Sequence, residues 1–105
     1  MDPFNMLKQD VETAMWQLRS DFATREDMLD DRRGINIEIF DHMGIKMLNG
    51  ISGVRSNLQS MEESVQEVRE RPSDFQISET ELKARDRFIS ASYRQLNELE
   101  DGITE

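Results

Sequence analysis

Several residue types are scarce in this chain of 105 residues, which contains no cysteine, two prolines and one histidine. Without cysteine, disulfide staples and zinc-thiolate sites are excluded, and a reducing compartment is permitted without being proved. No apolar run reaches the roughly eighteen residues that a membrane-spanning helix needs. The first residues, Met-Asp-Pro-Phe-Asn-Met, lack the basic region and apolar core of a signal peptide, so we expect a cytosolic protein.

The side chains that carry catalysis are equally sparse. With His42 as the only histidine and no Gly-x-Ser-x-Gly motif, neither a Ser-His-Asp nor a Cys-His arrangement can form, and His42 is expected at the surface. The glycines of residues 50–53 lie inside a helical pattern, not after a strand, which excludes a phosphate-binding loop. If Gly34 were the sixth position of a calcium loop, Leu29 and Phe40 would occupy two ligand positions that neither can fill. We therefore expect no enzyme, no cofactor and no metal.

The charge balance restricts the partners. Thirteen basic and twenty-two acidic residues give a net charge of -9, which repels nucleic acid and anionic membrane surfaces. Hydrophobic residues make up 36% of the chain and charged residues 33%, a composition typical of one soluble, charge-covered helical domain.

A seven-residue repeat over residues 37–68 is the strongest structural signal. Apolar side chains recur at two positions of each heptad, and among the ten positions Gly44 is the one exception. The first series is Ile37, Gly44, Ile51, Leu58 and Val65, and the second is Phe40, Met47, Val54, Met61 and Val68. This period predicts a long helix with one apolar stripe against partner helices.

The N-terminal segment predicts a first helix over residues 3–24. Asp2 is expected to cap it, with Pro3 at the first helical position, where the missing N–H costs nothing. Its apolar stripe consists of Phe4, Leu7, Val11, Ala14, Met15, Leu18 and Phe22. Trp16 falls beside this stripe and is expected to be a partly covered edge residue. Charge concentrates over residues 23–34. Either the first helix extends in part through this segment or the segment is a mobile loop, and we favour a loop with some helical content.

The second helix is predicted over residues 36–71, and Pro72 ends it. Gly44, Gly50 and Gly53 weaken its first half by about 1 kcal/mol each relative to alanine. A kink or the close approach of a neighbouring helix would account for these glycines, and the sequence leaves both open.

A third helix is predicted over residues 79–102. Ser78 and Glu81 form a capping box, and Ile77 and Leu82 form a hydrophobic staple around it. Leu82, Ile89, Ser92, Leu96, Leu99 and Ile103 form its stripe.

Two further residues of this helix carry specific expectations. Gly102 is a possible residue just past the helix end. Arg85 occupies a stripe position, so it either pairs with Glu81 or buries its stem and keeps its charged head in solvent.

Three amphipathic helices with a short connection between the last two predict an all-α fold, an antiparallel up-down-up three-helix bundle formed by a single domain over residues 1–105. We expect a monomer. The alternative is a structural helical module, spectrin-like or a dimeric coiled coil, in which the heptads of residues 37–68 close a homodimer.

Motifs in two parts of the chain, residues 2–4 and 65–89, also resemble a known family. The run V-x-x-V-x-x-x-P-x-x-F-x-I is followed by E-L-x-x-R-x-x-F-I, and the chain opens with Asp-Pro-Phe; the matching residues are Val65, Val68, Pro72, Phe75, Ile77, Glu81, Leu82, Arg85, Phe88 and Ile89. This pattern resembles the N-terminal domain of the syntaxin-6 family of Qc SNAREs. The resemblance implies a regulatory three-helix domain, similar to the Habc domains of syntaxins, that precedes a SNARE motif and a C-terminal membrane anchor.

The resemblance also implies a place and partners. Such proteins lie on the cytosolic face of trans-Golgi and endosomal membranes, and their N-terminal domains bind tethering complexes of the GARP type. Cognate SNAREs would bind through the C-terminal part, which is not in this chain, so this fragment should not insert into membranes.

Residues that the bundle does not obviously need are the candidates for partner binding. On the third helix these are Arg85, Arg87, Phe88 and Tyr93, and at the start of the chain they are Asp2, Pro3 and Phe4. Phe88 could equally belong to the core, and Asp-Pro-Phe is already explained by helix capping and the first stripe. Recognition would take the form of a short peptide or helix in a groove between two helices, and the sequence does not say which pair.

Overall fold

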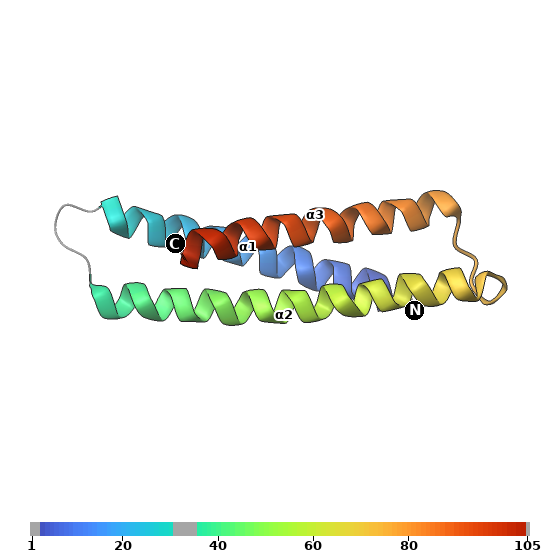
Figure 1. The fold of residues 1–105 in the computed structure, drawn as a ribbon, viewed down its shortest axis with the longest axis horizontal. Coiled ribbons are helices and arrows are strands. Elements are labelled where there is room, and N and C mark those ends of the chain that lie inside the picture. Colours follow the sequence, from blue (N-terminus) through green and yellow to red (C-terminus); the bar gives the residue numbers. More distant parts are fainter. Residues whose placement is uncertain (1–2, 31–35, 105) are drawn as a thin grey trace.

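The computed structural model describes residues 3–30 and 36–104 and forms a rod of 61 × 20 × 18 Å. Helix α1 covers Pro3–Asp30, α2 covers Ile37–Glu70 and α3 covers Glu79–Thr104, with a short 3-10 turn, η1, at Pro72–Asp74. The three helices run up, down and up along the rod (Figure 1). The predicted all-α antiparallel three-helix bundle is confirmed.

Helix α2 carries the core. It packs along both other helices, whereas α1 and α3 contact each other only sparsely. Eight of its ten heptad positions are buried: Gly44, Met47, Ile51, Val54, Leu58, Met61, Val65 and Val68. The facing side chains include Phe4, Val11, Met15, Leu18, Leu82, Ile89, Leu96 and Ile103. The stripe is therefore used within one chain, which removes the seam that a coiled-coil dimer would need.

The favoured loop is wrong for residues 25–30, and the alternative, extension of the first helix, is confirmed there, because α1 continues to Asp30. Arg25 follows Phe22 at helical spacing and stacks its guanidinium over the Phe40 ring, 3.8 Å from its centroid. Its Nε also donates a hydrogen bond of 3.0 Å to the Phe40 carbonyl oxygen. These contacts with α2 stabilise the helical conformation of the charged segment. Residues 31–34 of the predicted loop lie outside the described residues.

The first turns of α2 are less buried than the heptads predict. Asn36 caps the helix by accepting a hydrogen bond of 3.2 Å from the Ile39 amide, but Ile37 is 68% exposed. A Cβ on Gly44 would lie 2.8 Å from the Arg25 guanidinium, and one on Gly50 would lie 3.2 Å from Leu18. Close approach of α1 therefore explains these two glycines.

The third glycine of α2 has no such neighbour. A Cβ at Gly53 would meet nothing within 4 Å. Helix α2 runs unbroken through all three glycines to Glu70.

The connection from α2 to α3 follows the local signals. Pro72 opens the 3-10 turn, and Ser78 Oγ accepts a hydrogen bond of 3.1 Å from the Glu81 amide, as a capping residue should. The prediction for Gly102 is wrong, since α3 continues through it to Thr104. A Cβ at Gly102 would lie 2.7 Å from the Phe22 ring, so the glycine lets α3 approach α1.

Candidate functional site

The structure divides the seven residues that the sequence singles out. Pro3, Phe4 and Arg85 come together at one end of the bundle. Arg87, Phe88 and Tyr93 point in three other directions from α3, as described below. Asp2 lies outside the described residues. The set is therefore not one surface.

A hollow of about 270 Å³ lies at the end of the rod where α2 turns into α3. The start of α1, the last two turns of α2, the α2–α3 connection and one turn of α3 enclose it. We name it the end hollow, and its lining is Pro3, Ser64, Glu67, Val68, Phe75, Ile77 and Arg85. Its wall is apolar on the side of the connection and charged on the side of α3 and Glu67.

Arg85 is buried in its entirety, with 5% of its surface exposed. Its guanidinium lies over the Phe4 ring, 4.4 Å from the centroid, and its Nε donates a hydrogen bond of 3.1 Å to Glu81 Oε1. The predicted pairing with Glu81 is confirmed, and the predicted solvent-exposed head is wrong. A ring face and a carboxylate together compensate the guanidinium for lost water.

Phe88 faces α1, whereas Arg87 faces solvent. Phe88 is half-buried in a groove between α1 and α3, with the Lys8 ammonium 5.2 Å from its ring centroid. Arg87 is exposed on the outer surface beside Ala91. The alternative that Phe88 belongs to the core is confirmed in part, because its half-buried ring also packs against the buried cluster.

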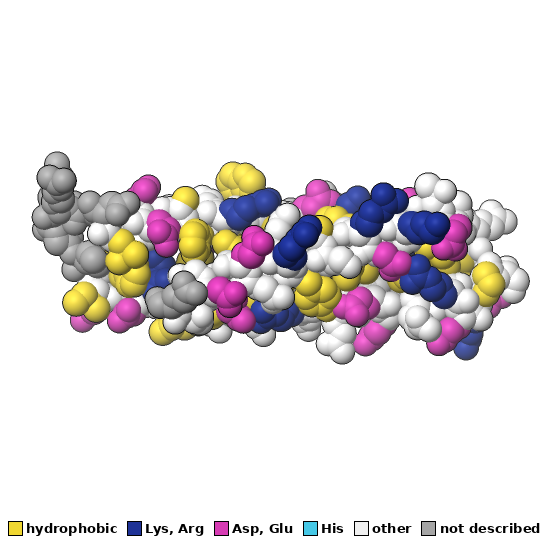
Figure 2. Space-filling view, turned by 45° about the horizontal axis from the view of Figure 1, so that its top comes forward, with side chains coloured by type: hydrophobic (Ala, Val, Ile, Leu, Met, Phe, Trp, Pro, Cys, Tyr) yellow, Lys and Arg dark blue, Asp and Glu magenta, His cyan; other side chains and the backbone are white. Residues whose placement is uncertain are grey.

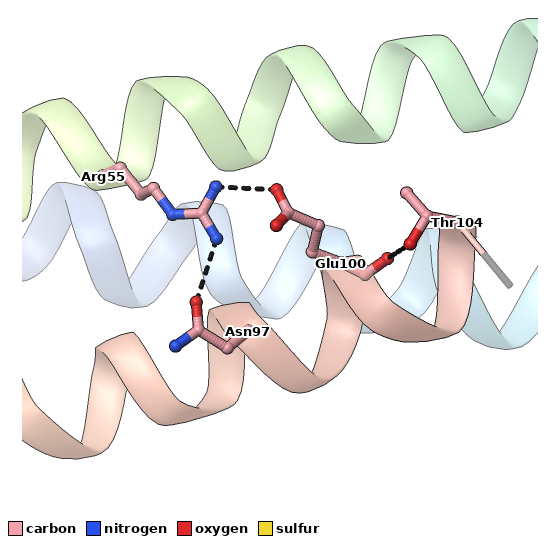
Figure 3. Close-up of polar contacts among 4 residues, drawn as sticks. All are labelled: Arg55, Asn97, Glu100 and Thr104. Carbon is pink, nitrogen blue, oxygen red and sulfur yellow. Dashed lines mark hydrogen bonds and ion pairs between the residues drawn. The ribbon is translucent and has the colours of Figure 1, made fainter.

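Tyr93 faces α2. Burial, followed by a hydrogen bond to Glu62, raises the pKa of its hydroxyl from 10.0 to about 12. Beside it, Arg55 of α2 donates hydrogen bonds of 2.7 Å to Glu100 and 2.9 Å to Asn97 of α3 (Figure 3). Tyr93 thus belongs to a polar seam that joins α2 and α3.

Residues 3–30 and 36–104 hold no group of three or more His, Cys, Asp and Glu side chains placed to bind a metal ion. His42 is exposed on α2, as expected. Within the same residues no helix is both long and apolar enough to cross a bilayer.

Two residues that matter for the surface of the structure, Arg25 and Trp16, were assigned no role from the sequence. Arg25 was hidden in a run of charges, although it continues the stripe three residues after Phe22. Trp16 was expected to be partly covered and is 66% exposed, in the wall of the α1–α3 groove. A tryptophan one residue away from a buried stripe position is the signal that could have pointed to this groove.

The antiparallel three-helix bundle is the fold that the resemblance to syntaxin N-terminal domains implies. The family model for the N-terminal domain of syntaxins 6, 10 and 61 matches residues 2–100. The chain belongs to this family.

Individual relatives agree with the family. The chain is 24% identical to human syntaxin-6 and 25% identical to chicken syntaxin-6, in each case over 103 residues and 98% of this chain. It spans 40% and 41% of the lengths of these two proteins. Family membership supports a SNARE-related role.

Proposed function

We propose that this chain is the regulatory N-terminal domain of a SNARE that acts between endosomes and the trans-Golgi network. In this role it binds a segment of a tethering complex of the GARP type. It works without catalysis, on the cytosolic face of the membrane, while cognate SNAREs bind a downstream part of the same protein. Family membership supports the SNARE role, and the end hollow supports peptide capture.

One observation carries the proposal. The motifs that resemble the syntaxin-6 family lie at opposite ends of the sequence, and the fold brings residues from both into the end hollow. Pro3 comes from the opening Asp-Pro-Phe, Val68 and Phe75 come from the first long motif, and Arg85 comes from the second. The residues that resemble the family therefore line a surface hollow and are not all used to fill the core.

The size and lining of the end hollow indicate what it binds. A volume of about 270 Å³ is below that of a typical small-molecule site, so one apolar side chain of a peptide fits better than a cofactor. Phe75 and Ile77 are half-buried and Pro3 is exposed, which leaves apolar surface for such an anchor. The peptide backbone would then lie between the start of α1 and the α2–α3 connection.

Calorimetric titration with N-terminal segments of tether subunits tests this function. We expect at least one segment to bind, and we expect Ile77→Ala and Phe75→Ala to weaken it about tenfold, which is the effect of losing an apolar anchor worth about 1.4 kcal/mol. Phe88→Ala, in the α1–α3 groove, is the matched control and should leave the affinity unchanged. Helical circular dichroism confirms that each variant is folded.

Failure of every tether segment to bind would reject the proposed partner. Binding that is insensitive to Phe75 and Ile77 but sensitive to Phe88 would move the site to the α1–α3 groove. Sedimentation should show a concentration-independent monomer, because the stripe of α2 is already buried, and a stable dimer would instead favour the coiled-coil alternative.

A further inference from the structure

The seam between α1 and α3 is open, in contrast to the two seams that α2 makes. A hollow of about 380 Å³ lies along it, followed by a second of about 250 Å³. We call the two together the α1–α3 groove. Its lining is Val11, Glu12, Met15, Trp16, Arg19, Phe22, Phe88, Ala91, Ser92, Gln95, Glu98 and Leu99.

The groove is lined by large apolar side chains that remain partly or largely exposed to solvent. Trp16, the only tryptophan of the chain, leaves 66% of its surface in solvent. Phe88 is half-buried on the opposite wall, and Phe22 and Leu99 are half-buried in the second hollow. Exposed aromatic surface of this kind is typical of an interface for another protein.

The charges around the groove oppose the charge of the molecule. Lys8 and Arg19 lie on the α1 side, and Arg87 and Arg94 flank Ala91 on the α3 side. Three carboxylates, Glu12, Asp86 and Glu98, lie among these four cations, and Asp86 is already paired with Arg69 of α2. Figure 2 shows dark blue side chains, with magenta ones between them, over the middle and right of the face on which α3 lies. The rim is thus locally positive on a chain with a net charge of -9.

The two hollows follow one another at a regular spacing along α1 and α3. Arg19 Nη1 donates a hydrogen bond of 3.4 Å to Gln95 Oε1 across the seam, and both residues line both hollows. Along each helix the lining residues of the second hollow lie about six positions beyond those of the first, which is about 9 Å at 1.5 Å per residue. Two side chains seven residues apart on one face of a partner helix are separated by about 10.5 Å.

We propose that the α1–α3 groove binds an acidic amphipathic helix of a partner protein, with one large apolar side chain in each hollow, seven residues apart. Such a helix would lie between α1 and α3 and complete a four-helix arrangement. Its carboxylates would face Arg19, Arg87 and Arg94. This surface is distinct from the end hollow, so the inference stands apart from the proposed capture of a tether.

Trp16 reports on the test directly, because it is the only tryptophan. The probe is a synthetic acidic helical peptide of about four turns with two leucines seven residues apart, and the control peptide moves the second leucine by two positions. We expect the first peptide to shift the Trp16 emission to shorter wavelength in a saturable way and to bind more weakly as salt increases. The control peptide should bind about tenfold more weakly or not at all.

Charge-reversal variants of the domain distinguish attraction by the cations of the groove rim from attraction by the net charge of the molecule. The double variant Arg19→Glu, Arg94→Glu should bind the first peptide at least about tenfold more weakly. The control is the double variant Lys46→Glu, Arg71→Glu, which reverses two exposed cations on α2 and at its end. Its affinity for the peptide should change less than about twofold. Circular dichroism verifies the fold, and Ala91→Gln, which narrows the groove without changing charge, provides a second weakening variant.

Three results would overturn the inference. Equal binding of both peptides, or equal loss in both charge variants, would show non-specific attraction. The same emission shift with vesicles of anionic lipid would indicate a membrane surface instead. A shift that grows with protein concentration alone would indicate a second copy of this chain. Because Phe75→Ala leaves the groove intact, failure of tether binding and failure of this inference are separate results.

Discussion

Two arginine–phenylalanine stacks lie at opposite ends of the rod and differ in how far the bundle covers them. At the end hollow, Arg85 lies over Phe4, with 5% and 2% of their surfaces exposed. At the other end, Arg25 lies over Phe40, and both are only half-buried. The same pair of side chains thus occurs once inside a core and once at its edge.

The lengths of the helices explain this difference. Helix α3 has 26 residues and α2 has 34, so α3 is about 12 Å shorter at 1.5 Å per residue. Figure 1 shows α1 and α2 extending beyond the C-terminal end of α3. Two helices bury less surface than three, which leaves Leu29, Ile37, Ile39 and Ile45 between 52% and 68% exposed. The stack of Arg25 on Phe40 lies at the edge of this region, where Gly102 and Ile103 of α3 line the same hollow.

The largest expected effect comes from removing the ring at each end in turn. Phe4→Ala should lower the free energy of unfolding by about 3–5 kcal/mol, because it empties a buried site beneath Arg85. Phe40→Ala should lower it by about 1–2 kcal/mol, because the ring is already half in water. Urea unfolding followed by circular dichroism measures both changes.

The slope of unfolding against urea is the internal control, since an unchanged slope indicates that the native and unfolded states keep their compactness. Equal losses for the two variants would contradict the comparison. They would mean that the Arg25 end is as firmly packed as the end hollow.

The sequence predicted the fold because the fold depends on a repeat. Eight of the ten heptad positions of α2 are buried. The two exceptions, Ile37 and Phe40, lie in the first turn of α2, near the C-terminal end of α3. Boundaries set by local chemistry, such as Pro72 and the cap at Ser78, were also predictable. Gly102 was not, because its role depends on Phe22 of another helix.

The candidate site was less predictable, because the position of its side chains also depends on residues of other helices. Helical spacing places Arg87, Phe88 and Tyr93 on α3, but only the packing shows that Phe88 turns to α1 and Tyr93 to α2. The head of Arg85 was expected in water because a lone guanidinium on a stripe usually stays there. The Phe4 ring that receives it lies 81 residues earlier in the chain, beyond the reach of any local pattern.

A smaller effect tests the glycines of α2 near the loosely covered end. Gly53→Ala should raise the free energy of unfolding by about 1 kcal/mol, because alanine restricts the unfolded chain and meets no neighbour. Gly44→Ala should gain much less, because its Cβ would displace the Arg25 guanidinium from the Phe40 ring. Thermal and urea unfolding of both variants provide the measurement.

Gly44→Ala combined with Arg25→Ala sharpens this test. With the guanidinium removed, the alanine at position 44 should recover the gain that is seen at position 53. If Gly44→Ala alone stabilises the protein as much as Gly53→Ala, the stack of Arg25 on Phe40 contributes nothing to stability.

The smallest expected effect concerns Arg55, which lies on α2 between the two stacks and pairs with a carboxylate instead of a ring. The hydrogen bond from Arg55 lowers the pKa of Glu100 from its ordinary value of 4.5. Since the folded state holds Glu100 in its charged form, this contribution is present above pH 4.5 and is lost as the pH falls through the lowered pKa. Glu100→Gln should therefore flatten the acid limb of stability against pH, by a small amount because the pair is largely solvated and screened by salt. Glu98→Gln, an exposed carboxylate on the same helix, is the matched control, and an equal flattening in both variants would show that the effect comes from net charge and not from Arg55.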